Sequence, residues 1–274
     1  MKHLILGSAG QIGYHLCNVL RARGEEVITY DIVDNPMKED LRYQTSYLYS
    51  CIQKADVVYF LAFDIGGSVY MQKYQDTFNF IDNNSKIMTN VFNALEIFNK
   101  PFIFASSQMS NMSYSTYGIL KALGEKYTEA LGGVVVKFWN VYGYEKDEEK
   151  SHVITDFIKM ALNNKEIKMR TNGKEVRQFL YGDDCAECLI ELISNYEQID
   201  RKKPLHITNF KWNSVLEIAE IIREFIPCTI MPSTKTDTVQ LDKRNEPNDY
   251  ILDFWKPTTP LHEGIQEIIL KLNK

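Results

Sequence analysis

Three glycines near the start of the chain constrain its fold more than any other feature. They are Gly7, Gly10 and Gly13 in "GSAGQIG", which joins an apolar run, residues 2–8, to a helical pattern that ends at Gly24. Gly7 permits a tight turn between strand and helix, Gly10 leaves room for a pyrophosphate at the backbone, and Gly13 lets the helix pack closely on the strand. The N–H groups and partial positive charge at the start of this helix favour a bound phosphate.

A carboxylate follows at the position that distinguishes two dinucleotides. Asp31 ends the second predicted strand, residues 25–31, which places it 31 − 13 = 18 positions after Gly13. Such a carboxylate accepts two hydrogen bonds from an adenosine ribose and repels a 2′-phosphate, and the next three residues supply no arginine. The pattern favours NAD over NADP. The alternative is a strand end and tight turn without a ligand.

Short apolar strands and helices alternate through the first half of the chain. The predicted strands are 2–8, 25–31, 56–62, 101–107 and 134–143, and the predicted helices are 9–24, 45–55, 70–100 with a break near Asp82, and 116–131. Continuous apolar strands separated by helices are typical of a parallel sheet covered on both faces. We therefore predict an α/β fold with a Rossmann-type, doubly wound parallel sheet.

The pattern changes after Gly143, where a charged stretch begins. Helices are expected at 152–162 and 213–225, the second capped by Asn213 or Ser214, and strands at 176–182 and 204–210. From Cys228 the chain is expected to be irregular until a helix at 261–272. We assign 1–146 to an NAD-binding Rossmann lobe, to which 180–210 return. A smaller C-terminal substrate-binding lobe comprises 147–179 and 211–274.

Composition excludes several classes of partner. The 274 residues are 45% hydrophobic and 24% charged, with a formal net charge of −5. Nucleic acids and anionic membranes require a basic face, so neither is expected as a partner. No run approaches about 18 apolar residues, so no membrane span is expected. The first ten residues read as a strand and not as a signal peptide, and we expect a cytoplasmic protein.

The cysteines favour neither a disulfide framework nor a metal site. There are five, and two of them form the Cys185-x-x-Cys188 motif. One interpretation is a redox or metal pair. The other is two small apolar residues on a helix capped by Asp183 or Asp184. No second Cys or His pair has zinc spacing, so the second interpretation is favoured and no metal is expected.

Five motifs in order resemble the extended short-chain dehydrogenase/reductase family, of the NAD-dependent nucleotide-sugar epimerase/dehydratase type. The spacing G-x-x-G-x-x-G precedes a Tyr-x-x-x-Lys pair, Tyr117 and Lys121. "KFWNVYG" is similar to the family's R-x-x-N-V-Y-G, "TNGKEVRQFLYGDD" to G-x-x-x-R-D-F-x-Y-V-D-D, and "WKPTTPLHEGIQEII" to its closing motif. The resemblance runs along almost the whole chain and implies a nucleotide-diphosphate sugar as substrate. It also implies a homodimer formed by the helices at 84–99 and 117–131.

The resemblance assigns catalytic roles to Ser107, Tyr117 and Lys121. Ser107 would hydrogen-bond the reacting sugar oxygen, and Tyr117 would be the general acid and base. A phenol has a pKa of about 10 and is a poor base at neutral pH. The ammonium of Lys121, one helical turn away, and the positive nicotinamide would lower that pKa toward the working pH.

The resemblance also implies binding residues. Those for the cofactor are Gly7, Gly10, Gln11, Ile12, Gly13, Asp31, Asp40, Leu41, Leu61, Ala62, Tyr117 and Lys121. Those for the substrate are Gly66, Gly67, Ser68, Asn84, Ser107, Asn140, Arg177 and Arg244. The arginines suit diphosphate because a guanidinium binds phosphate oxygens in pairs. Arg244 reads equally as a solvated surface residue.

Departures from the family pattern reduce the number of reactions that the resemblance allows. Gln108 and Met109 replace the Asp–Glu pair that dehydratases use, which disfavours dehydration. "FDIGGSVYMQ" resembles a loop of GDP-mannose 3,5-epimerase, but Met109 stands where that enzyme has a cysteine and cannot exchange a proton. The gap from Ser107 to Tyr117 is also short. We expect transient oxidation and epimerisation at C4. The alternatives are a 4-keto-6-deoxy sugar reductase, a 3,5-epimerase and a non-catalytic NAD sensor.

Overall fold

A six-stranded parallel sheet forms the larger half of the molecule. The computed structural model describes residues 1–145, 147, 149–237 and 245–273. The sheet has the order β2-β1-β3-β4-β5-β9. Its strands are β1 Lys2–Leu6, β2 Glu26–Tyr30, β3 Val57–Phe60, β4 Phe102–Ser107, β5 Val134–Phe138 and β9 Leu205–Ile207. The strand order reverses beside β1, as in the predicted doubly wound Rossmann-type sheet, and a crevice forms at such a reversal.

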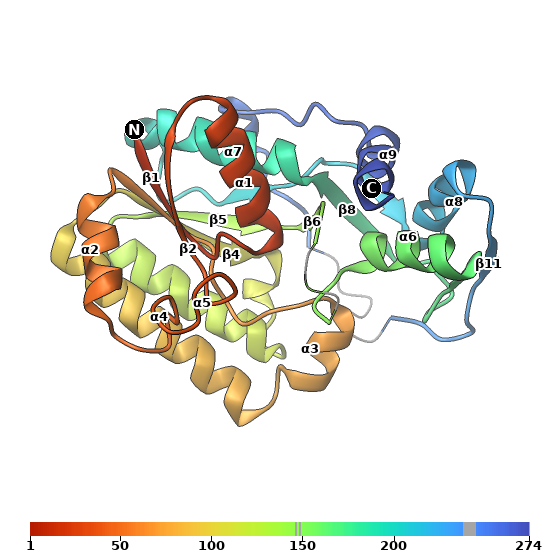
Figure 1. Ribbon diagram of the computed structural model, residues 1–274, viewed down its shortest axis with the longest axis horizontal. Coiled ribbons are helices and arrows are strands. Elements are labelled where there is room, and N and C mark those ends of the chain that lie inside the picture. Colours follow the sequence, from red (N-terminus) through yellow and green to blue (C-terminus); the bar gives the residue numbers. More distant parts are fainter. Residues whose placement is uncertain (146, 148, 238–244, 274) are drawn as a thin grey trace.

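Helices cover both faces of this sheet, as predicted (Figure 1). One face carries α1 Gln11–Ala22 and α7 Gly182–Ser194, and the other carries α2 Ser46–Lys54, α4 Phe78–Phe98 and α5 Thr116–Ala130. Leu4 and Leu6 of β1 point into one apolar cluster with α2 and α4, whereas Ile5 points into the cluster with α1 and α7. Strand β1 is therefore buried on both sides, which explains its continuous apolar sequence.

A smaller half packs around a third apolar cluster. Its elements are β6 Asn140–Tyr142, α6 Val153–Asn164, β7 Glu166–Lys168, β8 Val176–Tyr181, β10 Trp212–Ser214, α8 Val215–Phe225, β11 Thr229–Met231 and α9 Leu261–Leu272. Strands β10, β8 and β6 form one small sheet, and β11 pairs with β7 in another. α8 begins with a capping box in which Ser214 and Glu217 satisfy each other's backbone N–H groups, which confirms Ser214 as its cap.

Three predicted boundaries were wrong. The helical stretch 70–100 breaks not at Asp82 but between α3 Ser68–Tyr74 and α4, where Thr77 caps α4 by accepting a hydrogen bond from Phe80 N. The strand predicted at 134–143 divides at Trp139, after which β6 joins β8 in the small sheet. The tail predicted to be irregular contains β11 and a short 3-10 turn, Tyr250–Asp253.

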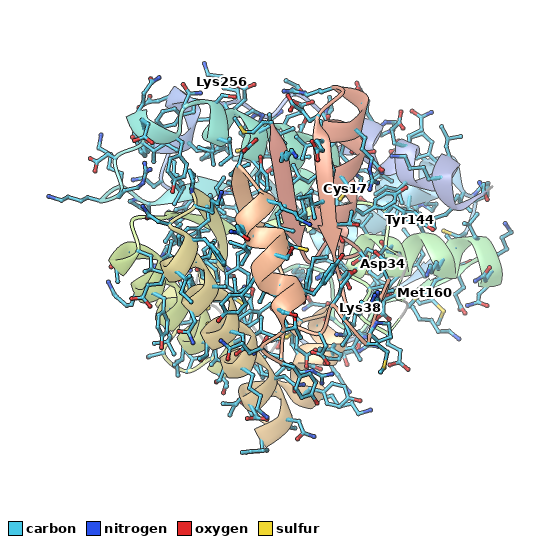
Figure 2. The ribbon with its side chains drawn as sticks, turned by 60° about the vertical axis from the view of Figure 1, so that its left-hand side comes forward. Cys17, Asp34, Lys38, Tyr144, Met160 and Lys256 are labelled. Atoms are coloured by element: carbon cyan, nitrogen blue, oxygen red, sulfur yellow. The ribbon has the colours of Figure 1, made fainter. Side chains whose placement is uncertain are left out.

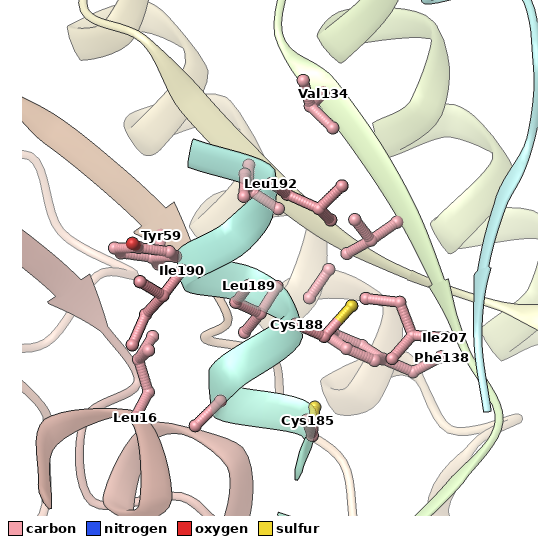
Figure 3. Packing of buried hydrophobic residues seen from close by; sticks show 14 of the residues in the cluster. Leu16, Tyr59, Val134, Phe138, Cys185, Cys188, Leu189, Ile190, Leu192 and Ile207 are labelled. Carbon is pink, nitrogen blue, oxygen red and sulfur yellow. The ribbon is translucent and has the colours of Figure 1, made fainter. Parts of the chain in front are cut away.

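The cysteines of the C-x-x-C motif are core residues on α7. Cys185 and Cys188 are completely buried, and Cys188 points toward Phe138 and Ile207 (Figure 3). Burial raises the pKa of both thiols above the ordinary value. The apolar interpretation is thus confirmed, and Cys17 is buried on α1 in the same cluster (Figure 2).

The predicted acidic cap of α7 was wrong. The cap position is Tyr181, and no side chain caps this helix end. Asp184 instead accepts hydrogen bonds from the backbone and hydroxyl groups of Thr258 and Thr259, and so holds the C-terminal segment against the large sheet. Asp183 pairs with the buried His15 of α1.

Candidate active site

A cavity of about 1580 Å³ opens at the carboxyl ends of the main strands, and residues of both halves line it. Its volume exceeds the roughly 300–1,000 Å³ of ordinary small-molecule sites. It is lined by Gly7, Gly10, Gln11, Ile12, Gly13, Asp31, Asp40, Leu41, Leu61, Ala62, Gly66, Gly67, Ser68, Ser107, Tyr117, Lys121, Asn140 and Arg177. These residues, all candidates from the sequence, therefore surround one space large enough for two ligands.

The glycine loop forms a cradle that side chains would fill. Gly7 has φ of +93°, and a Cβ there would lie 2.8 Å from Ala62 N. A Cβ on Gly13 would lie 2.1 Å from Gly7 O. Gly10 is the cap residue of α1, and no side chain makes a capping hydrogen bond at this helix end. Residues 10–13 line the cavity, and a first helical turn without a side-chain cap fits a dinucleotide pyrophosphate.

Two carboxylates lie on the wall that follows β2. Asp31 Oδ2 accepts a hydrogen bond from Ala9 N at 2.9 Å, and its Oδ1 accepts one from Val33 N at 2.9 Å. Asp31 thus ties the glycine loop to the end of β2. The Arg42 guanidinium donates hydrogen bonds to both carboxylate oxygens of Asp40, with its Nη2 2.7 Å from Oδ2. These hydrogen bonds hold the pKa of Asp40 below its ordinary value.

Ser107, Tyr117 and Lys121 meet at the end of β4 and the start of α5. Ser107 ends β4, and its Oγ accepts a hydrogen bond from Met109 N at 3.1 Å. The cap of α5 is Ser115, whose Oγ accepts from Gly118 N at 3.1 Å and so fixes the helical turn that carries Tyr117. The Ser107 hydroxyl acts on the Tyr117 phenol and favours its charged form. A Cβ on Gly118 would lie 2.3 Å from Met109 O, so a glycine is required for this close approach.

Burial dominates the electrostatics of this group. Burial raises the pKa of Tyr117 well above its ordinary value, against the hydrogen bond from Ser107, which lowers it. Burial lowers the pKa of Lys121 to about 7, against the charge of Glu125, which raises it. Lys121 Nζ donates to Ala105 O at 2.6 Å and lies 3.7 Å from the centre of the Phe63 ring. A lysine with this pKa changes its charge near neutral pH.

The loop after β3 is anchored around Asp64. Asp64 accepts hydrogen bonds from Tyr70 Oη at 2.6 Å and Asn83 Nδ2 at 3.1 Å, and pairs with Lys150 Nζ at 3.0 Å. These contacts outweigh burial and hold the pKa of Asp64 below its ordinary value. Gly67 then meets the other half of the molecule, because its N donates to Lys150 O at 3.0 Å.

Asn84 is placed behind this loop and does not line the cavity. Its side chain has no exposed surface. Oδ1 accepts from Asp64 N at 2.7 Å, and Nδ2 donates to Asp64 O and to Phe80 O. The amide therefore fixes the loop from beneath.

The predicted diphosphate residues lie toward the smaller half. Asn140 begins β6, and Arg177 of β8 pairs with Asp237 and donates to Val176 O at 2.7 Å. Arg244 lies outside the described residues. Because a carboxylate already engages the Arg177 guanidinium, a bound phosphate would have to compete with Asp237.

Sequence reasoning missed a second titratable pair on the cavity wall, Glu145 and His152. His152 Nδ1 lies 2.5 Å from Glu145 Oε1, and His152 N donates to Glu145 Oε2 at 3.0 Å. The only signal in the sequence is a Glu and a His seven positions apart in a charged stretch.

The described residues contain neither a metal-binding cluster nor a membrane-spanning helix. No group of three or more His, Cys, Asp or Glu side chains converges as for a metal ion within the described residues. Over the same residues, no helix combines the length and the apolar character needed to cross a bilayer.

Known proteins resemble this chain along its length. UDP-glucuronic acid decarboxylase 1 of Arabidopsis thaliana is 23% identical, over 98% of this chain and 69% of the relative. GDP-mannose 3,5-epimerase 1 of Oryza sativa subsp. indica is 26% identical, over 96% and 79%. The structure of UDP-glucose 4-epimerase with UDP-glucose from Thermotoga maritima superposes with a TM-score of 0.84 at 18% identity, over 100% of this chain and 99% of the other.

A match to a protein-family model shows the family to which the chain belongs. Residues 3–208 match the model described as the NAD dependent epimerase/dehydratase family, which is most of the chain and includes the glycine loop, Ser107, Tyr117 and Lys121. The chain therefore belongs to the NAD-dependent epimerase/dehydratase family, as its motifs indicated, and its cofactor is NAD.

Proposed function

We propose that the protein is a nucleotide-sugar epimerase that oxidises its substrate transiently at C4 and then reduces it on the opposite face. The observation that carries the proposal is that Ser107, Tyr117 and Lys121 line the same cavity as a glycine loop without a side-chain cap. A pure NAD sensor has no need of an acid–base group next to its cofactor site.

The residues that would hold NAD are the loop Gly7–Gly13 for the pyrophosphate, Asp31 for the adenosine ribose, and Lys121 for the nicotinamide ribose. When bound, NAD supplies a hydride acceptor and donor together with a positive charge. That charge and the Lys121 ammonium both favour the phenolate of Tyr117, whose pKa burial otherwise raises.

The chain's own groups then move the proton. Tyr117 takes the proton of the reacting hydroxyl and later returns it, and the Ser107 hydroxyl donates a hydrogen bond to the sugar oxygen. The cavity volume of about 1580 Å³ supports a sugar that presents each of its faces in turn to the same group. Gln108 and Met109 line the cavity beside Ser107, and neither side chain titrates, which supports epimerisation over loss of water.

A panel of nucleotide sugars incubated with the holoenzyme in D2O tests the proposal. We expect a C4 epimer whose C4 hydrogen is the original one, because the hydride is removed and returned without exchange. Mass spectrometry of the products locates the label. Deuterium at C4 itself would contradict the mechanism. Conversion only of a keto sugar with added NAD(P)H would indicate a reductase, and no turnover with NAD bound would indicate a sensor.

Asp31→Asn should weaken NAD binding about tenfold, since a charged acceptor for the ribose hydroxyls is lost. It should also reduce the discrimination against NADP, because the repulsion of a 2′-phosphate falls. Calorimetric titration with both dinucleotides measures the two effects. Asp34→Asn is the matched control, because Asp34 lies on the same loop (Figure 2) but does not line the cavity. Equal NAD affinities for Asp31→Asn and the unchanged protein would refute the assignment.

We also propose a homodimer through α4 and α5. Their outer faces expose apolar side chains, namely Phe78 at 77%, Ile81 at 39%, Ile97 at 61%, Ile119 at 53%, Leu123 at 46% and Tyr127 at 41%. An apolar surface of this kind is usually covered by a partner. A sedimentation experiment that finds only monomer at micromolar concentration would rule this out.

A further inference from the structure

His152 is held in one orientation by Glu145. It is the cap residue of α6, and its backbone N and its ring Nδ1 contact the two oxygens of the same carboxylate. Glu145 is only 9% exposed, and the contacts with His152 outweigh burial and keep its pKa below the ordinary value. A buried carboxylate that binds one ring nitrogen fixes the tautomer and direction of an imidazole, as in catalytic triads.

The other ring nitrogen of His152 is available to a ligand. Among the described residues, Nε2 has no hydrogen-bond partner, and the side chain is 39% exposed and lines the cavity. Two carboxylates, Glu145 and Asp156, act on the ring. Burial lowers the pKa of His152, but the hydrogen bond and charge of Glu145 and the charge of Asp156 outweigh it and raise the pKa above the ordinary value.

His152 and Tyr117 lie at opposite ends of one short loop, Phe63–Gly67. The Tyr117 and Phe63 rings are 5.9 Å apart, whereas a Cβ on Gly67 would lie 3.4 Å from His152 Cα. Five residues span at most about 17 Å when fully extended. Both side chains line the same cavity, so a hexose can lie between them.

We propose that His152, positioned by Glu145, is a second catalytic base, which removes a carbon-bound proton from C3 or C5, next to the carbonyl that forms at C4. This inference rests on the proposed function for the origin of the carbonyl. The C–H bond breaks, the proton passes to Nε2, and the electron pair forms the C=C bond of an enolate. The enolate oxygen accepts hydrogen bonds from Ser107 and Tyr117. Return of the proton from Nε2 restores the ketone.

The neighbouring side chains are poorly suited to act as this base. Met109 has no exchangeable proton, and the amide of Gln108 accepts a hydrogen bond from Asn245 Nδ2 at 2.6 Å. Lys150 is paired with Asp64 at 3.0 Å. A neutral imidazole is the side chain best suited to take a proton near physiological pH.

The test uses a sugar that already carries a carbonyl at C4, so the result does not depend on the oxidation step. The holoenzyme is incubated in D2O with a nucleotide-linked 4-keto-6-deoxyhexose, and NMR follows deuterium at C3 and C5. We expect exchange well above the buffer rate, and a loss of about a hundredfold in His152→Gln. His262→Gln is the matched control, because His262 also contacts a glutamate, Glu224, but does not line the cavity.

A second variant separates a base from a merely structural residue. Exchange by the unchanged protein should rise with pH as His152 loses its proton. In Glu145→Gln the contact that raises this pKa is weakened, so the rise should move to lower pH. An exchange rate no higher than that of buffer, or one unchanged in His152→Gln, would overturn the inference. If the keto sugar exchanges but no sugar alcohol is ever oxidised, only the proposed function fails.

Discussion

Tyr117→Phe should lower turnover by about a hundredfold to ten-thousandfold while the protein still folds and binds NAD. The change removes one oxygen, which is the atom that exchanges a proton with the sugar hydroxyl in the proposed reaction. The ring packs edge-on against Phe63 at 5.9 Å, and phenylalanine retains this contact. Turnover of the best nucleotide sugar from the panel, measured alongside NAD affinity and thermal unfolding, gives the comparison.

Tyr127→Phe is the control on the same helix. Tyr127 is 41% exposed, stacks on Phe92 at 5.0 Å and lies outside the cavity lining, so its hydroxyl should contribute nothing to turnover. Should Tyr117→Phe retain more than about a tenth of the original rate, another group must carry the proton, and the proposed role of the phenol would be withdrawn.

Gly13→Ala should abolish NAD binding and destabilise the protein by about 1–3 kcal/mol or more, because no space exists for the added methyl group. A Cβ at this position would lie 2.1 Å from Gly7 O and 2.8 Å from Ser8 Cα. Both atoms belong to the backbone, so α1 would have to move away from β1. That movement would displace the N–H groups that face the pyrophosphate.

Alanine variants of two other glycines distinguish an effect on NAD binding from an effect on folding stability. Gly10→Ala adds a methyl group 3.3 Å from Gly7 O at the cavity surface, so it should fold but bind NAD weakly. Gly24→Ala meets no atom within 4 Å, but its φ of +77° is strained for alanine, so it should lose about 1–2 kcal/mol and keep its NAD affinity. NAD titrations and urea unfolding of the three variants measure these effects. Normal NAD binding by Gly13→Ala would contradict the role of the loop.

The large sheet was predictable because the sequence patterns that specify its strands lie within short stretches of the chain. Strands β1, β3 and β4 are apolar runs buried on both faces, as in Val57–Phe60, and each is followed by a helical period. The short strands of the smaller half were not predicted as such. β7, β10 and β11 have three residues each, too few to show a period of two. Their pairing depends on contacts from distant parts of the chain.

The candidate site was predictable where a motif fixes the backbone, and less so where side chains meet through space. The glycine loop and the Tyr-x-x-x-Lys helix supply cavity-lining residues as expected. Asn84 was predicted to contact the substrate, but it binds the loop at Asp64 instead. In a sequence, a polar residue on an apolar helix looks the same whether it binds a ligand or a loop of the protein. The pairing of Glu145 with His152 arises only from the turn between β6 and α6.

The chain passes repeatedly between its two halves, at Trp139, at Gly182 and after Ile207. Cys185 and Leu205 belong to the apolar cluster of the first half, although β8 before them and β10 after them build the second. A chimaera that grafts new sugar specificity onto this scaffold therefore cannot be made by one fusion point. It requires at least two inserts whose junctions keep α7 and β9 from the parent, since a single C-terminal cassette would carry away an edge strand of the nucleotide-binding sheet.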